Sequence, residues 1–139
     1  LYEACKGKGA MLNGRSIHVS GKNDTQESVV STGFPIDKDR NPDNNLDNLA
    51  RILPMVRGVR RQGSAAFDLC CVAAGILDGY WEFNLHLWDV CAGILIVTEA
   101  GGTVRSFRED RNVSIVAGTP AIVEQLYPRL SDKPGKICL

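Results

Sequence analysis

The sequence predicts an α/β fold in which helices form layers against a β-sheet, and three observations lead to this prediction. Segments rich in β-branched and aromatic residues alternate with helical segments along the chain. Two of the helical segments, Ala65–Leu77 and Val90–Ala100, are apolar on nearly every side, which is typical of buried helices. The chain has 139 residues, of which 44% are hydrophobic. That is enough for one hydrophobic core and too little for two.

Residues 1–20 are predicted to form a strand–turn–strand unit. Strands are expected at Tyr2–Cys5 and Ile17–Ser20, with turn residues at Gly7–Ala10 and at Asn13-Gly14 between them. Asn-Gly is the strongest short signal for a β-hairpin. The chain opens at Leu1, inside the first predicted strand and without a methionine, so we expect it to be part of a longer protein.

Residues 21–130 are predicted to form the main α/β domain, which starts with a strand at Ser28–Thr32. The next helix is expected to begin at Asn41–Asp43, which offers an N-cap, a proline at the first helical position and an acid in the first turn. Pro54 should end or kink this helix. Its apolar face is formed at helical spacing by Leu46, Leu49 and Leu53.

The second half of this domain continues the alternation. A short strand at Gly58–Arg61 leads into the helix Ala65–Leu77, and an aromatic strand at Gly79–Phe83 leads into the helix Val90–Ala100. Residues 131–139 are predicted to be a frayed tail. The remaining predicted elements are strands at Thr103–Phe107 and Ser114–Ala117 and a closing helix at Thr119–Leu126, with Thr119 as its N-cap and Pro120 at its first position.

Composition excludes several classes of partner and compartment. Lys plus Arg and Asp plus Glu both number 16, so no global field favours nucleic acid or an anionic membrane. The longest apolar stretch falls short of the roughly 20 residues of a bilayer span. Five cysteines without a C-x-x-C spacing indicate a reducing compartment. We therefore expect a soluble, cytoplasmic protein that binds neither nucleic acid nor membrane.

The turn Gly63-Ser64-Ala65-Ala66 is the first candidate site, because it runs into the start of a helix. Free backbone N–H groups and the helix dipole at such a place can bind an oxygen-rich ligand. Taken alone, however, Ser64 is more often a plain N-cap.

Two carboxylates form the second candidate. Glu82 ends a predicted strand and Asp89 begins a predicted helix, so both can point into one cleft. Each also has a structural explanation, since Asp89 could be a helix N-cap and Glu82 a solvated strand end. Neither could hold Mg²⁺ unaided, because this ion needs about six oxygen ligands. The two histidines, His18 and His86, are too far apart in sequence to suggest a zinc site.

Together these fragments resemble the C-terminal half of the inositol monophosphatase family. The W-D-x-x-A-G…E-A-G-G signature at this spacing is highly specific, and Gly7–Ser20 resembles the strand–turn–strand that joins the two halves of that family. The other segments that carry the resemblance are Gly63–Leu69, Val72–Gly75, Asp78–Glu82, Trp88–Gly93 and Glu99–Gly102.

The resemblance implies a layered sandwich in which a mixed β-sheet lies between helices. It also implies Mg²⁺-dependent hydrolysis of a small phosphate monoester, such as inositol phosphate or a related sugar phosphate, by a homodimer. In this family the aspartate matching Asp89 is a metal ligand and the glutamate matching Glu82 binds substrate hydroxyls. The turn matching Gly63, Ser64 and Ala65 lines the substrate pocket.

The sequence departs from the family in one large respect. The family's N-terminal half supplies a glutamate and a D-P-x-D-G-T segment, which hold most of the metal ligands, and neither occurs here. We therefore expect this chain by itself to be catalytically incompetent.

Two alternatives stay open: a non-catalytic relative that acts as a binding or dimerisation module, and an enzyme of the fructose bisphosphatase or nucleotide phosphatase branches. Residues 81–85 favour the monophosphatase branch over the latter two.

Overall fold

A five-stranded mixed sheet forms the centre of the molecule in the computed structural model, which describes residues 1–130. The strand order is β5-β4-β6-β8-β7, in which β4 runs parallel to β5 and β6 while β8 runs antiparallel to β6 and β7. The strands are β4 (Val29–Thr32), β5 (Gly58–Arg60), β6 (Gly79–Leu85), β7 (Thr103–Ser106) and β8 (Val113–Gly118).

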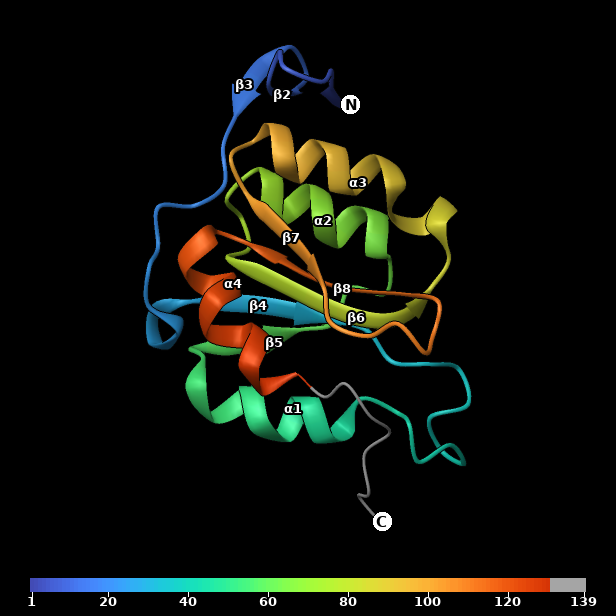
Figure 1. Cartoon of the computed structure of the whole chain (residues 1–139). Coiled ribbons are helices and arrows are strands. Elements are labelled where there is room, and N and C mark those ends of the chain that lie inside the picture. Colours follow the sequence, from blue (N-terminus) through green and yellow to red (C-terminus); the bar gives the residue numbers. More distant parts are fainter. Residues whose placement is uncertain (131–139) are drawn as a thin grey trace.

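Helices cover both faces of this sheet (Figure 1). Helices α2 (Ala65–Ala73) and α3 (Leu87–Glu99) pack on one face, and α1 (Leu46–Ile52) and α4 (Pro120–Leu126) pack on the other. The predicted mixed sheet between layers of helices is confirmed. Residues 1–130 also contain three short 3₁₀ helices: η1 (Thr25–Glu27), η2 (Leu53–Met55) and η3 (Tyr127–Arg129).

The central strand β6 contributes to both cores because its side chains alternate between the two faces. Tyr80 packs into the core beneath α2 and α3, whereas Trp81 packs into the core beneath α1 and α4, and both are fully buried. The next residue, Glu82, lies on the same face as Tyr80. The alternation of the strand therefore aims this carboxylate at the α2 and α3 side of the sheet.

A small antiparallel sheet precedes the five-stranded sheet along the chain and has three strands instead of the predicted two. It consists of β1 (Tyr2–Ala4), β2 (Ala10–Leu12) and β3 (Arg15–Ile17). The Asn13-Gly14 turn joins β2 to β3, and both residues have positive φ, as a tight hairpin turn requires. The sequence prediction missed β2 because turn residues flank its three positions on both sides.

Glu99 fastens this small sheet to the C-terminal end of α3. Its carboxylate oxygens accept the backbone N–H groups of Gly7 at 2.8 Å and Gly9 at 2.9 Å. These backbone hydrogen bonds lower the pKa of Glu99 below its usual value. The glutamate of the E-A-G-G motif thus has a structural partner far away in sequence.

Helix α1 begins at Leu46, later than predicted. Its N-cap is Asn45, which adopts a left-handed conformation with φ of 71°. The predicted start at Asn41–Asp43 is wrong, because the Asp43 carboxylate is buried in ion pairs with Arg108 and Arg111 and holds this segment as a loop. The closing helix α4 agrees with its prediction, since Thr119 caps it and Pro120 occupies its first position.

The boundaries of α2 and α3 also differ from the prediction. Helix α2 ends at Ala73 instead of Leu77, because Gly75 takes a left-handed conformation (φ 69°) that terminates the helix. Helix α3 begins at Leu87 with His86 as its N-cap, so Asp89 lies inside the first turn and not at its start.

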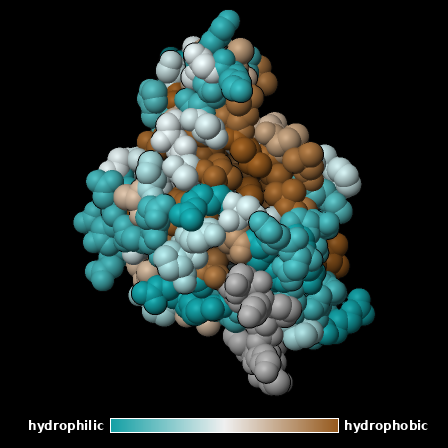
Figure 2. Space-filling model, viewed as in Figure 1, coloured by the Kyte–Doolittle hydropathy of each residue, from teal (hydrophilic) through white to brown (hydrophobic). Residues whose placement is uncertain are grey.

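The outward faces of α2 and α3 remain exposed, although the sequence pattern predicted burial all round. Figure 2 shows hydrophobic surface gathered over this part of the molecule. Trp88 is 76% exposed and Ile76, just after α2, is 64% exposed. The other large exposed apolar residues of these two helices are Phe67, Leu87 and Leu95. None of the helices within residues 1–130 is long and apolar enough to cross a membrane.

Candidate functional site

A cavity of about 390 Å³ lies where the ends of β4 and β6 meet the first turns of α2 and α3. All five residues predicted from the sequence line it: Gly63, Ser64, Ala65, Glu82 and Asp89. The structure therefore brings together segments that are up to 26 positions apart in sequence. The remaining lining residues are Gly33, Arg61, Ala66, Leu85 and Trp88.

The wall formed by α2 is the start of this helix. The Ser64 hydroxyl accepts the N–H of Phe67 at 3.4 Å, so its interpretation as an N-cap is confirmed. Gly63 has φ of 87°, and a Cβ at this position would lie 2.4 Å from Nη1 of Arg61. The cap and the pocket wall are the same residues, and the positive end of the helix dipole faces the pocket.

Glu82 provides the carboxylate on the β6 side of the pocket. The Tyr80 hydroxyl donates a hydrogen bond to Oε2 of Glu82 at 2.7 Å. Burial raises the pKa of Glu82 above its usual value, and the nearby charges of Asp68 and Asp89 act in the same direction. The Tyr80 hydrogen bond and the positive charge of Arg61 lower this pKa and partly oppose the effect of burial.

Gly33, at the end of β4, makes room for this carboxylate. A Cβ at position 33 would lie 2.1 Å from Oε1 of Glu82, which is far inside the contact distance. In the sequence, Gly33 follows the predicted strand Ser28–Thr32, and Arg61 ends the predicted strand Gly58–Arg61. No local pattern marks either residue as part of a pocket.

Asp89 provides the carboxylate on the α3 side. It is the third residue of the helix, and its Oδ2 accepts the backbone N–H of His86 at 3.0 Å. The interpretation of Asp89 as the N-cap residue is thus wrong, because His86 occupies that position three residues earlier. The Asp89 carboxylate still stabilises the start of the helix by accepting the His86 N–H. The rings of His86 and Trp88 stack beside it with centroids 4.3 Å apart.

A further carboxylate, Asp68, lies behind the pocket within α2. It is almost fully buried, and its Oδ1 accepts a hydrogen bond from Nε2 of Gln62 at 3.0 Å. Burial raises the pKa of Asp68, and the hydrogen bond from Gln62 partly opposes this shift. Asp68 therefore contributes negative charge near Glu82 without lining the pocket.

The described residues do not form a complete metal centre by themselves. Within residues 1–130, no group of three or more His, Cys, Asp or Glu side chains is placed to hold a metal ion. The neighbouring acidic residue Asp78 is bound elsewhere, since its Oδ2 accepts the N–H of Val29 at 2.7 Å and pairs with the Lys22 ammonium at 3.0 Å. Asp89 alone offers too few oxygens for Mg²⁺.

Comparison with known proteins identifies the family. The sequence profile of the inositol monophosphatase family matches residues 1–133. The chain belongs to this family. A relative named putative Nus factor SuhB, from Neisseria meningitidis, is 42% identical over 135 residues, which cover 94% of this chain and 52% of the relative. Inositol-1-monophosphatase from Synechocystis is 46% identical over 107 residues, covering 77% of this chain and 37% of that enzyme.

Solved structures of this family share the fold. Inositol monophosphatase from Anabaena superposes with a TM-score of 0.86 at 37% identity, covering 96% of this chain and 55% of that one. SuhB from Mycobacterium tuberculosis gives a TM-score of 0.80 at 37% identity, covering 93% of this chain and 52% of that one. The chain thus spans about half the length of the relatives it matches. The predicted resemblance and the predicted fold class are both confirmed.

Proposed function

We propose that this chain is the C-terminal part of a Mg²⁺-dependent phosphatase that hydrolyses inositol phosphate or a related sugar phosphate. Membership of the inositol monophosphatase family supports a phosphatase at the level of the family. The observation that carries the finer proposal is the pocket in which Glu82 and Asp89 face the start of α2. An anionic ester with several hydroxyl groups suits this combination of carboxylates, backbone N–H groups and one arginine.

The chemistry of the side chains at the pocket fits one part of a magnesium site. Asp89 would supply one carboxylate ligand, held in place by its hydrogen bond from the His86 N–H. When bound, Mg²⁺ neutralises charge on the phosphoryl group and activates water. The remaining ligands must come from outside residues 1–130, and this agrees with the missing D-P-x-D-G-T segment.

The other pocket residues would bind and orient the ester. The positive end of the α2 dipole, formed by Gly63, Ser64 and Ala65, would attract its oxygens. The Glu82 carboxylate would accept hydrogen bonds from hydroxyl groups of the polyol, with Tyr80 fixing its position. The chain would then need its second half for the reaction itself. In its organisation, residues 1–20 would be the strand–turn–strand segment that leads into the α/β domain of residues 21–130.

Glu82→Gln tests the role of this carboxylate in the full-length enzyme, meaning the polypeptide that contains residues 1–139 together with the second half. We expect the substitution to change the ranking of sugar phosphates by kcat/KM, because an amide presents a donor where the hydroxyls of the substrate need an acceptor. Steady-state kinetics on several sugar phosphates, at varied Mg²⁺, measure this effect. A uniform loss on every phosphate ester together with weakened Mg²⁺ binding would show that Glu82 serves the metal.

A non-catalytic module is the second candidate function. Several curated relatives are named Nus factors and not phosphatases, among them the Neisseria protein of 42% identity. A chain that keeps the fold but lacks the metal ligands would serve as a binding or dimerisation module and would not catalyse a reaction. The coding sequence upstream of Leu1 separates the two candidates: a D-P-x-D-G-T segment supports the phosphatase, and its absence supports the module.

The surface and the thiols support two further parts of the proposal. The exposed apolar residues of α2 and α3 would be covered by the second half or by a second copy of the chain. Coverage by a second copy would fit a homodimer.

The cysteines of the described residues, Cys5, Cys70, Cys71 and Cys91, are free thiols. Free thiols suit a reducing, cytoplasmic compartment. That the protein binds no nucleic acid stays a prediction.

A further inference from the structure

We propose that Asn45 is a positioning residue that sets the orientation of the Glu82 carboxylate from the opposite side of the sheet. Asn45 is fully buried at the start of α1 and lines no part of the pocket. It acts on the two backbone segments that flank the carboxylate, the end of β4 at Gly33 and the strand β6 at Trp81. The inference rests on the proposed role of Glu82 in substrate binding.

The Asn45 side chain uses its whole hydrogen-bonding capacity to join these segments. Its Nδ2 donates to the carbonyl oxygen of Gly33 at 2.7 Å and to Oγ1 of Thr32 at 2.9 Å. Its Oδ1 accepts the indole N–H of Trp81 at 3.0 Å and Nδ2 of Asn48 at 3.0 Å. One side chain therefore ties β4, β6 and α1 together, and all of these bonds are buried.

The two segments held by Asn45 determine where Glu82 can lie. Glu82 follows Trp81 directly in β6, so fixing the Trp81 side chain and backbone fixes the base of Glu82. The Thr32 hydroxyl adds a bond of 2.7 Å to the carbonyl oxygen of Trp81. Gly33 faces the Glu82 carboxylate so closely that a Cβ would lie 2.1 Å from it. A shift of either segment would move or rotate this carboxylate.

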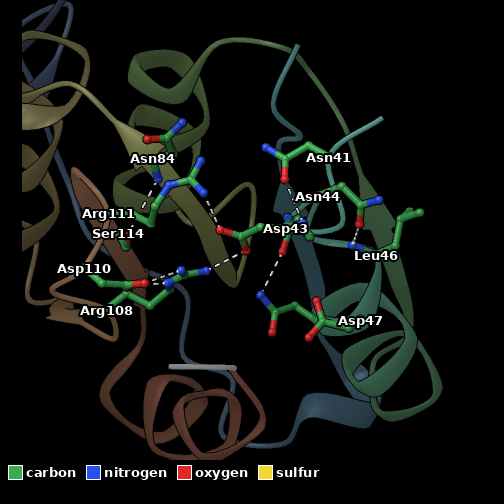
Figure 3. A network of polar contacts seen from close by, with 12 residues as sticks. Asn41, Asp43, Asn44, Leu46, Asp47, Asn84, Arg108, Asp110, Arg111 and Ser114 are labelled. Atoms are coloured by element: carbon green, nitrogen blue, oxygen red, sulfur yellow. Dashed lines mark hydrogen bonds and ion pairs between the residues drawn. The ribbon is translucent and has the colours of Figure 1, made fainter. Parts of the chain in front are cut away.

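An ion-pair network outside the pocket fixes the loop that leads into Asn45. Asp43, two residues earlier, pairs with Nη1 of Arg108 at 2.7 Å and with Arg111 (Figure 3). Arg108 is itself bound by Asp110 through two hydrogen bonds of 2.8 and 2.9 Å. The β7–β8 connection thus anchors the loop before α1, and the N-cap of this helix, Asn45, has φ of 71°.

Asn45→Gly removes the side chain while glycine keeps the left-handed backbone without strain. In the 139-residue chain, NMR reports the result without any need for activity. The chain has two tryptophans, and the exposed Trp88 serves as an internal reference for the buried Trp81. We expect the Trp81 indole N–H to exchange faster and the ¹³C signal of the Glu82 carboxyl, assigned through Glu82→Gln, to shift. An unchanged Glu82 signal would overturn the proposal.

In the full-length enzyme, Asn45→Gly should lower kcat/KM for inositol phosphate by about 10-fold or more, because a misplaced binding group loses most of its contribution. For a phosphate ester without hydroxyls the loss should stay below about threefold, since Glu82 has nothing to bind there. The effect should nearly vanish in a Glu82→Gln background, because coupled residues are not additive. Equal losses for both esters, or additive losses in the double variant, would contradict the proposal.

Two further variants separate positioning from mere stability. Val123→Ala weakens the core that contains Trp81 and removes no hydrogen-bond partner of Asn45, so it should leave the ratio between the two esters unchanged. Thr32→Val removes one partner of Asn45 and should act in the same direction as Asn45→Gly, even if the latter folds poorly. If no ester is hydrolysed by the full-length polypeptide, the proposed function fails while the NMR result still decides the role of Asn45.

Discussion

Asp89→Asn in the full-length enzyme should lower kcat by about two orders of magnitude or more. A bound hard cation would lose an anionic ligand, and metal stabilisation of a phosphoryl group is worth several kcal/mol. Asparagine still accepts the hydrogen bond from the His86 N–H, so the cap of α3 is retained and the fold should be unaffected. Phosphate release at varied Mg²⁺ measures the effect.

A matched control for this variant is Asp47→Asn, which removes an acidic group paired with Arg51 and not part of the pocket. It should keep nearly all of the activity. Full activity of Asp89→Asn at saturating Mg²⁺ would mean that Asp89 only caps its helix and is not a metal ligand.

Arg108→Met should lower the free energy of unfolding of the chain by about 3–5 kcal/mol. The guanidinium is 1% exposed and pairs with Asp43, which is also buried, so its removal leaves a buried carboxylate with a single remaining arginine partner, Arg111. Hydrogen bonds to Asp110 and Asp43 raise the pKa of Arg108 further, so it stays charged at every pH of interest. Urea denaturation followed by circular dichroism measures the change.

Glu124→Gln provides the comparison for that measurement. It breaks an exposed ion pair with Arg105, in which the Glu124 side chain is 70% exposed. Exposed pairs of this kind contribute about 1 kcal/mol or less. A loss of similar size in Arg108→Met and in Glu124→Gln would contradict the view that the Asp43–Arg108 pair anchors the loop before α1.

Local signals in the sequence were sufficient for elements whose ends depend on their own residues. Helix α4 begins where Thr119 and Pro120 predicted it, because a cap and a proline act within one turn. The start of α1 could not be found in this way. Asp43 is buried by an arginine 65 positions away, and the left-handed conformation of Asn45 is held by partners in β4 and β6.

The same distinction applies to the site. Glu82, Asp89 and the turn at Gly63 could be predicted because a family signature connects them at fixed spacing. Gly33 could not, since the need for glycine there arises from a carboxylate 49 positions later in the chain. A residue whose role depends on a distant partner, as that of Gly33 depends on Glu82, can be identified only in the folded structure, where segments distant in sequence lie side by side.

Phosphate release from inositol phosphate in the presence of Mg²⁺ tests the central claim most directly. The full-length polypeptide should hydrolyse the ester and lose its activity when the metal is chelated, because the second half completes the ligand set. The 139-residue chain should show no turnover under the same conditions. Turnover by the monomeric 139-residue chain at the rate of the full-length polypeptide, abolished by chelation, would contradict this account.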